Sequence, residues 1–219
     1  MSWDPVWEKV FQEREWGKYP AESLIRFIAR NYYREDRKNI RLLELGCGPG
    51  ANIWYMAREG FDVYGIDGSE TAIDKGKKRL ESEGLRAYLG TGDISSLPFD
   101  DNFFDGIIDV ECLYSNNRES TWKILAETKR VLKKGALFYS RTFTDEMFVG
   151  KSFEEIGYLE YSNILDGPFA GGFVRLADEE EIRTLYGKMF KIISVDRLEY
   201  TYNNNLIKVS EWIIICQKE

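Results

Sequence analysis

Apolar residues recur at helical spacing in the first part of the chain and gather in short runs after it. Residues 4–33 predict two helices, the second opening at Pro20, because proline fits the first turn of a helix. From residue 40 onward, short apolar runs bounded by glycine alternate with amphipathic stretches. The predicted strands cover 40–45, 63–66, 85–89, 106–110 and 136–142, and the helices between them cover 52–58, 69–82 and 119–132.

This alternation is typical of parallel β-α-β units, in which ligands bind at the carboxyl ends of the strands. The end of the chain follows another pattern. A helix is predicted from Asp178 to Gly187, with Asp178 as its N-cap. Glu181 can complete a capping box, in which its side chain accepts from the Asp178 backbone N–H. The stretches 191–202 and 206–217 are joined through three asparagines and predict an antiparallel hairpin.

Residues 143–176 show no clear period and are rich in Phe, Tyr and Gly. Such a segment suits a shaped, partly mobile wall over a substrate, although an extra helix on the sheet edge or a dimer contact would also fit. With 219 residues, the chain can bury one sizeable core and is short for two domains. We expect one domain over 1–219, divided into a helical arm (1–35), a ligand-binding core (36–142), a lid (143–176) and a closing helix with its hairpin (177–219).

Charge and composition exclude several classes of function. The net charge is −7, and no basic cluster exceeds residues 75–79, which opposes a nucleic-acid partner. No apolar run approaches the roughly 20 residues of a membrane helix, and the N-terminus carries no visible secretion signal, so we expect no membrane association. Cys47, Cys112 and Cys216 stand far apart, which argues against disulfides or a zinc site and favours the cytoplasm.

The chain contains no histidine, which excludes histidine-based metal sites and Ser-His-Asp chemistry. Any general base must therefore be Asp, Glu, Tyr, Lys or Cys. We expect no metal at the site.

The strongest chemical signal is a glycine-rich turn after the first predicted strand, where residues 44–50 read Glu-Leu-Gly-Cys-Gly-Pro-Gly. Glycine lets the backbone approach a ligand closely, and the helix that follows offers free N–H groups. Alone, the turn is ambiguous. Gly46, Gly48 and Ala51 also satisfy the dinucleotide pattern G-x-G-x-x-A, with Asp67 at a suitable distance, so an NAD-binding oxidoreductase has to be weighed.

Two further acids separate these interpretations. Asp67 ends the second predicted strand, where its carboxylate can accept both hydroxyls of a ribose. Asp93 follows the third strand, where its carboxylate can accept from an adenine amino group while the Ile94 backbone N–H donates to the ring. The Asp93–Ile94 pair, Pro49 in the turn and Glu44 before it fit a dehydrogenase poorly.

Over residues 40–142 the chain resembles the class I S-adenosylmethionine-dependent methyltransferases, of the type 11/25-like domain. The motifs that carry the resemblance are Glu-Leu-Gly-Cys-Gly-Pro-Gly, Gly-Ile-Asp-Gly-Ser, Gly-Asp-Ile with Leu-Pro-Phe, Phe-Asp, and Val-Leu-Lys-Lys-Gly-Ala-Leu. The resemblance implies a Rossmann-like α/β three-layer sandwich. Its sheet is seven-stranded and mostly parallel, with a reversed strand from the C-terminal hairpin and helices on both faces. It gives no matching detail for 1–35 or 143–176.

The resemblance also implies S-adenosyl-L-methionine as cofactor and S-adenosyl-L-homocysteine as product. The glycine turn and Glu44 would surround the methionine part, Asp67 would hold the ribose, and Asp93 with Ile94 the adenine. Asp109 and Val110 would line the amino end and the reaction centre. The expected cofactor-binding residues, with Trp16 of the arm as an aromatic cap, are Trp16, Glu44, Gly46, Cys47, Gly48, Gly50, Asn52, Asp67, Gly68, Ser69, Asp93, Ile94, Asp109 and Val110.

The predicted function is transfer of a methyl group to a small-molecule acceptor by in-line displacement. The enzyme must align acceptor, methyl and sulfur and exclude water, which can supply about 7–11 kcal/mol in favourable cases. The catalytic candidates are Glu111 and Tyr114, after the fourth strand, and Arg141, near the end of the fifth. A protein methyltransferase is the main alternative and an NAD-binding oxidoreductase the other. We expect a monomer or a homodimer.

Overall fold

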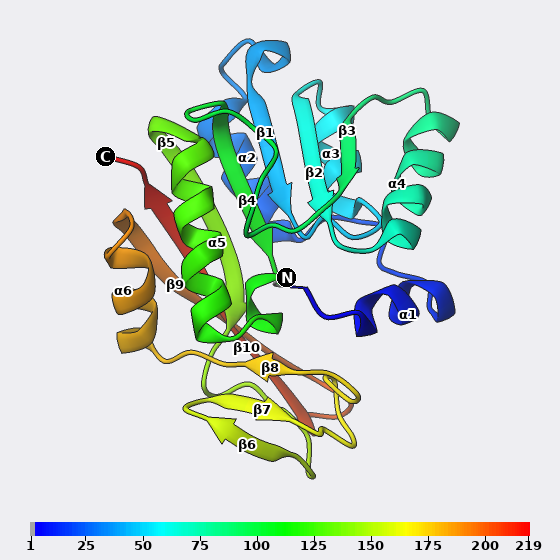
Figure 1. Ribbon diagram of the computed structural model, residues 1–219, viewed down its shortest axis with the longest axis vertical. Coiled ribbons are helices and arrows are strands. Elements are labelled where there is room, and N and C mark those ends of the chain that lie inside the picture. The colour runs from blue at the N-terminus through cyan, green and yellow to red at the C-terminus, as the bar shows by residue number, and fades with distance from the viewer. Residues whose placement is uncertain (1–2) are drawn as a thin grey trace.

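The computed structural model describes residues 3–219, so residues 1–2 of the expected arm lie outside the described residues. The main strands are β1 Arg41–Leu45, β2 Asp62–Asp67, β3 Tyr88–Thr91, β4 Phe104–Val110, β5 Leu132–Phe143, β9 Lys191–Tyr202 and β10 Ile207–Gln217. They form a seven-stranded sheet in the order β3-β2-β1-β4-β5-β10-β9 (Figure 1). The first five are parallel, whereas β10 runs antiparallel to both β5 and β9. The predicted fold class is confirmed.

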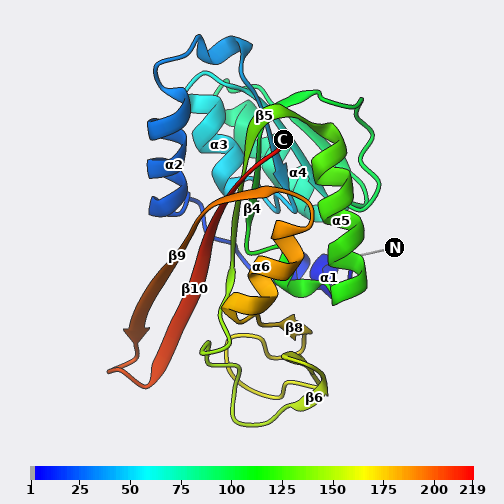
Figure 2. The same ribbon diagram turned by 90° about the vertical axis from the view of Figure 1, so that its left-hand side faces the viewer.

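Helices cover both faces of this sheet (Figure 2). One face carries α2 Glu22–Tyr32, α3 Ala51–Arg58 and α4 Glu70–Ser82, and the other carries α5 Arg118–Val131 and α6 Glu179–Gly187. Two short 3-10 helices, η1 Arg37–Asn39 and η2 Leu113–Ser115, lie before β1 and after β4. Within residues 3–219, no helix combines the length and the apolar character needed to span a bilayer.

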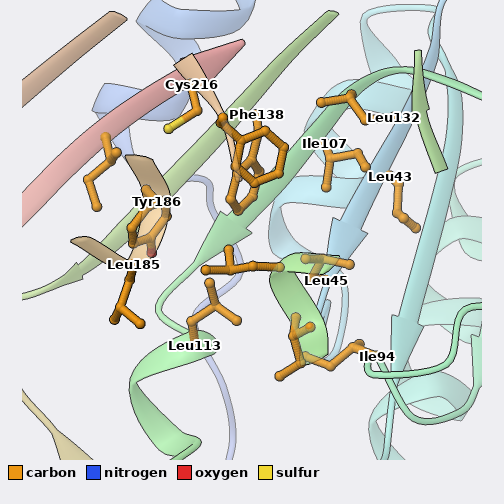
Figure 3. Packing of buried hydrophobic residues seen from close by; sticks show 14 of the residues in the cluster. Leu43, Leu45, Ile94, Ile107, Leu113, Leu132, Phe138, Leu185, Tyr186 and Cys216 are labelled. Carbon is orange, nitrogen blue, oxygen red and sulfur yellow. The ribbon is translucent and has the colours of Figure 1, made fainter. Parts of the chain in front are cut away.

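Each face of the sheet has its own apolar core. On the α2 to α4 side, Phe27 and Ile53 pack in one cluster with Leu42 and Ile108 of the sheet. Figure 3 shows the other side, where Phe138 lies beside Tyr186 of α6. Burying one such side chain contributes about 1.5–3 kcal/mol. The strands are therefore fixed from both faces, and their carboxyl ends form a rigid platform.

Several predicted boundaries are wrong by a few residues. The second helix begins at Glu22, so Pro20 precedes it, and β4 begins at Phe104 and not at residue 106. β3 begins at Tyr88 and not at residue 85, because Leu85 closes the end of α4. Its backbone N–H donates to the Leu80 carbonyl at 2.9 Å across the left-handed Gly84, a common way for a helix to end. β5 begins at Leu132, directly after α5, because that residue already pairs with Phe104.

The C-terminal elements follow the prediction with one exception. The three asparagines 203–205 all adopt left-handed backbone, with φ of 54°, 55° and 67°, and connect β9 to β10. Asp178 caps α6 by accepting from the Glu181 N–H at 2.7 Å. The capping box is wrong in its second half, since the Glu181 carboxylate accepts from Arg118 and Arg175 instead. That carboxylate is buried, and a buried charge is stabilised best by an ionic partner.

Outside the family resemblance, α2 covers a face of the sheet, whereas α1 Val6–Glu13 and the segment 143–176 lie toward the carboxyl ends of the parallel strands (Figure 1). In the arm, α1 packs beside α4. Residues 143–176 contain an antiparallel sheet of β6 Glu154–Gly157, β7 Glu160–Ser162 and β8 Val174–Arg175. The alternative of an extra helix in this segment is therefore wrong. A third apolar cluster, which includes Tyr114, Phe143 and Phe169, joins the segment to the main sheet.

Candidate cofactor and acceptor site

A cavity of about 580 Å³ lies at the carboxyl ends of the parallel strands. Its wall comes from the residues that follow β1 to β5, from the arm, and from the segment 168–173. Ligands of open α/β sheets bind at this edge. Ten of the expected cofactor residues line the cavity, namely Trp16, Glu44, Gly46, Cys47, Gly48, Asn52, Asp67, Gly68, Ile94 and Val110.

The glycine turn after β1 is a left-handed backbone segment. Gly46, Gly48 and Gly50 have φ of 60°, 50° and 81°, values that L side chains rarely adopt. At Gly46, a Cβ atom would also lie 2.1 Å from Sγ of Cys112, a distance that no real contact tolerates. The turn therefore requires glycine for its conformation and for its packing, and it exposes main chain to the cavity.

Asp67 ties this turn to the end of β2. Its Oδ2 accepts from the Gly48 N–H at 2.8 Å, and its Oδ1 accepts from the Ser69 N–H at 2.8 Å. Burial raises the pKa of this carboxyl, and the two backbone hydrogen bonds oppose the rise. Each oxygen keeps a further lone pair, so the carboxylate can also accept from hydroxyls of a ligand in the cavity.

Glu44, the last acid before the turn, is buried and incompletely paired. Its Oε1 accepts from Nδ2 of Asn52 at 2.5 Å, whereas its Oε2 has no hydrogen-bond partner among the described residues. Burial is the main cause that raises its pKa, to about 8. An unsatisfied buried polar atom costs about 1–3 kcal/mol. A cationic donor such as an α-ammonium group would satisfy it.

Four expected cofactor residues do not line the cavity. Gly50 caps α3, and Ser69 caps α4 by accepting from the Ala72 N–H. Asp93 accepts from the backbone and the hydroxyl of Ser95, next to the lining residue Ile94. Asp109 accepts from the Cys112 and Leu113 N–H groups and from the Ser140 hydroxyl. It shapes the turn after β4 from inside the protein.

The three catalytic candidates also line the cavity, and two of them, Glu111 and Arg141, form an ion pair. Arg141 places Nη2 3.3 Å from Oε1 of Glu111 and 2.5 Å from Oε2 of Glu211. Sequence reasoning missed Glu211 of β10, whose pKa burial raises to about 7. The sequence feature that could have identified Glu211 is its place between Val209 and Ile213, where an acid stands among the apolar positions of a predicted strand.

Tyr114 belongs to an aromatic wall. Its ring centroid lies 4.9 Å from that of Phe143 and 5.5 Å from that of Phe169, and Met147 lines the same wall. Burial raises the pKa of the Tyr114 hydroxyl far above its ordinary value. The side chain therefore stays neutral at physiological pH and contributes shape and apolar surface.

The arm closes the cavity from the α4 side. Trp7, Phe11 and Trp16 pack on one another with centroids 5.2–6.0 Å apart and line the cavity. Trp3 lies so close to Gly68 that a Cβ there would sit 2.4 Å from the indole. The residues Trp3, Trp7 and Phe11 were not among the expected site residues, because their spacing reads equally well as the buried face of a helix.

Comparisons with known proteins match the same part of the chain. A family model described as a methyltransferase domain matches residues 42–135. An uncharacterized Haemophilus influenzae protein is 30% identical over 146 residues, which cover 65% of this chain and 55% of that protein. This chain thus spans little more than half the length of that relative.

Two further matches bear on the family and on the fold, respectively. An uncharacterized methyltransferase of Schizosaccharomyces pombe is 30% identical over 104 residues, which cover 48% of this chain and 72% of the relative. A solved structure of a SAM-dependent methyltransferase from Methanosarcina mazei has the same fold, with a TM-score of 0.73, 23% identity and coverage of 91% of this chain and 98% of that one. The relative from Schizosaccharomyces pombe is named as a methyltransferase, in agreement with the methyltransferase interpretation of the sequence. The chain belongs to the S-adenosylmethionine-dependent methyltransferase family.

Proposed function

We propose that this chain binds S-adenosylmethionine and transfers its methyl group to a small-molecule acceptor, leaving S-adenosylhomocysteine. The observation that carries the proposal is the single cavity that joins the glycine turn to the aromatic wall. Its volume of about 580 Å³ falls within the range of roughly 300–1,000 Å³ that is usual for small-molecule sites.

The residues at the glycine turn fit the cofactor group by group. The unpaired Oε2 of Glu44 suits the α-ammonium of the methionine part, and Asp67 has lone pairs for the ribose hydroxyls. Ile94 lines the wall where an adenine ring would follow, with Asp93 next to it. When bound, the cofactor supplies a methyl group activated by a positively charged sulfur.

The acceptor end supports a small molecule over a macromolecule. The arm lies on one side of the cavity and the segment 168–173 on the other, so the reacting atoms are shielded from water. The net charge of −7 opposes a nucleic-acid substrate. In this arrangement residues 36–142 bind the cofactor, and residues 143–176 form part of the acceptor wall. The three free thiols, at Cys47, Cys112 and Cys216, suit the reducing cytoplasm.

Calorimetry with S-adenosylhomocysteine tests the proposal. Asp67→Asn removes the charge that receives the ribose hydroxyls, and we expect binding about tenfold weaker or worse. The matched control is Asp62→Asn at the start of the same strand, where the acid pairs with Arg41 at the surface. Binding by the control should equal that of the wild type. If the wild-type protein gives no binding heat, or if Asp67→Asn binds as tightly, the proposal is wrong.

A further inference from the structure

Glu111, the first residue after β4, has a backbone conformation that disfavours its own side chain. Its φ is 57°, in the left-handed region, where a residue with a Cβ is strained by about 1–2 kcal/mol. Its N–H donates to the Arg141 carbonyl at 2.9 Å, which fixes the turn in place. The strained backbone directs the chain from β4 into η2, and the Glu111 side chain, 35% exposed, lies at the cavity wall.

The carboxylate of Glu111 is also a surplus charge. Arg141 donates through both Nε and Nη2 to Oε2 of Glu211, at 2.9 and 2.5 Å, and the Glu211 side chain is only 1% exposed. That buried pair is complete by itself. Glu111 lies 3.3 Å from the same guanidinium, so two carboxyl groups share one cation, and the cluster carries a net negative charge when the pH is high enough to ionise both.

A second residue at this wall has an unused acceptor. Asn116 is 95% buried and lines the cavity, and its Nδ2 donates to the Cys112 carbonyl at 3.2 Å. Because that contact needs the amide nitrogen, the oxygen Oδ1 faces elsewhere, and it has no partner among the described residues. Asn116 therefore keeps an unpaired acceptor atom buried behind the cavity wall, and the guanidinium of Arg141 is already paired with carboxyl groups.

The wall around these groups is apolar and aromatic. Tyr114, Phe143, Met147 and Phe169 supply it, and the rings lie edge-on or tilted against one another. Among the described lining residues the other cation is Arg14, an exposed side chain on the arm. Strain and excess charge both oppose stability, and proteins retain such features where a ligand uses them.

We propose that the acceptor is a primary or secondary amine with an apolar body, and that Glu111 holds its cationic nitrogen. This inference rests on the proposed function. An anionic acceptor, such as a carboxylate or a phosphate ester, would meet the surplus negative charge and be repelled. Aromatic faces attract cations as well, by about 0.5–2 kcal/mol, so the wall and the carboxylate favour the same ligand.

The reaction balances with Glu111 as the proton acceptor. The bound ammonium passes one proton to the Glu111 carboxylate and becomes a neutral amine. The nitrogen lone pair then forms the new N–C bond, while the electron pair of the S–C bond goes to sulfur. The products are a methylated ammonium ion and the thioether S-adenosylhomocysteine, and the protonated Glu111 returns its proton to water.

Binding to the protein loaded with S-adenosylhomocysteine tests the inference. The probes are 2-phenylethylamine and its close analogues 2-phenylethanol and 3-phenylpropanoate, each titrated by calorimetry. We expect the amine to bind about tenfold tighter than either analogue, as for one charge-assisted hydrogen bond, and Glu111→Gln to remove that preference. Glu155→Gln on β6, an exposed position, is the control and should keep it.

Thermal stability supplies a second test. If Glu111 had a purely structural role, replacing it would lower the Tm. Glu111→Gly removes both the strain and the surplus charge, so we expect its Tm to rise by about 2–4 °C, with Glu111→Gln rising less. Binding of S-adenosylhomocysteine should be unchanged in both variants, and a failure at that step would count against the proposed function instead. The inference is overturned if the wild-type protein binds the analogues as tightly as the amine, or if it binds none of the three probes. It is also overturned if both Glu111 variants have a lower Tm than the wild type.

Discussion

The two ends of the cavity differ in whether main-chain or side-chain atoms form them. The cofactor end is main chain: three left-handed glycines, with two carboxylates placed by strands β1 and β2. The acceptor end is formed by side chains. An ion cluster there comes from β5, β10 and the residue after β4, and an aromatic wall comes from η2, β5 and residues 168–173. A backbone site is set by neighbours along the chain, whereas a side-chain site depends on residues brought together by the fold.

The two ends also differ in how they tolerate change. A backbone turn with positive φ favours glycine, and at Gly46 the packing against Cys112 also leaves no room for a Cβ atom, whatever the ligand is. An aromatic wall can exchange Phe for Tyr or Met and still enclose a ligand. The cofactor end can therefore serve many acceptors unchanged, and specificity can vary at the other end. The following predictions test whether this division is real.

The largest effect is expected at Gly46. Gly46→Ala adds left-handed strain of about 1–2 kcal/mol and a clash of about 1–3 kcal/mol with Cys112, so we expect a loss of about 3 kcal/mol in the free energy of unfolding. Binding of S-adenosylhomocysteine should disappear. The matched control is Gly60→Ala, because Gly60 is also left-handed at φ 87° but has nothing within 4 Å of the added Cβ.

Urea denaturation measures both variants. Gly60→Ala should lose about 1–2 kcal/mol, the strain alone, and should bind the ligand normally. If both variants lose the same free energy of unfolding, the turn requires glycine for its backbone conformation alone and not for its packing against Cys112. The division between the two ends would then be less sharp than the packing around Gly46 implies.

The same division explains what the sequence could predict. Gly46, Gly48 and Asp67 act through local backbone geometry, so their spacing predicted a ligand-binding turn after the first strand. The choice of cofactor also needed the Asp93–Ile94 pair and the family resemblance. Glu211 reaches Arg141, and Trp3 reaches Gly68, only through the tertiary fold, and no spacing in the sequence connects these pairs.

The small sheet in residues 143–176 was missed for a related reason. Its strands contain 4, 3 and 2 residues, too few to show an alternation of apolar and polar positions. The start of β3 was missed because Leu85, an apolar residue of the expected strand, closes the preceding helix.

The second prediction concerns pH at the cofactor end. Glu44 must be ionised to receive an ammonium group, and burial raises its pKa to about 8. Affinity for S-adenosylhomocysteine should therefore increase as the pH rises from about 6 to 8, by up to about tenfold per pH unit. Asp67 also has a raised pKa, but from a much lower ordinary value of 3.8. Glu44→Gln should bind more weakly and lose the dependence in this range.

The free protein should show the opposite trend. A carboxyl whose pKa is raised by folding stabilises the fold fully below its ordinary pKa of 4.5, and that contribution is lost as the pH rises through about 8. Thermal unfolding of the wild type between about pH 5 and 8 should therefore show a falling Tm. The fall should be less steep in Glu44→Gln, where Glu211 and Asp109, whose pKa values burial raises to about 7 and about 6, still contribute. Identical pH profiles for the two proteins, in binding and in unfolding, would contradict this role for Glu44.

The smallest effect is expected where the arm meets the cofactor end. Glu8 of α1 accepts from the Ser69 and Thr71 hydroxyls, each at 2.5 Å, at the start of α4. These hydrogen bonds hold α1 over the cavity beside Asp67. Because Glu8 lies near solvent, removing its charge should change stability little and act mainly on the opening of the arm. We expect Glu8→Gln to release S-adenosylhomocysteine about two- to fivefold faster, an effect of less than about 1 kcal/mol.

Stopped-flow tryptophan fluorescence can measure this release, since Trp3, Trp7 and Trp16 all line the cavity. The control is Glu13→Gln on the same helix, where the acid makes only a long, exposed pair with Lys9 at 3.8 Å. Its release rate should equal that of the wild type. If Glu8→Gln also releases at the wild-type rate, the arm opens by a route that leaves its contact with α4 intact. The cofactor end would then be closed by its own main chain and the acceptor wall, without help from α1.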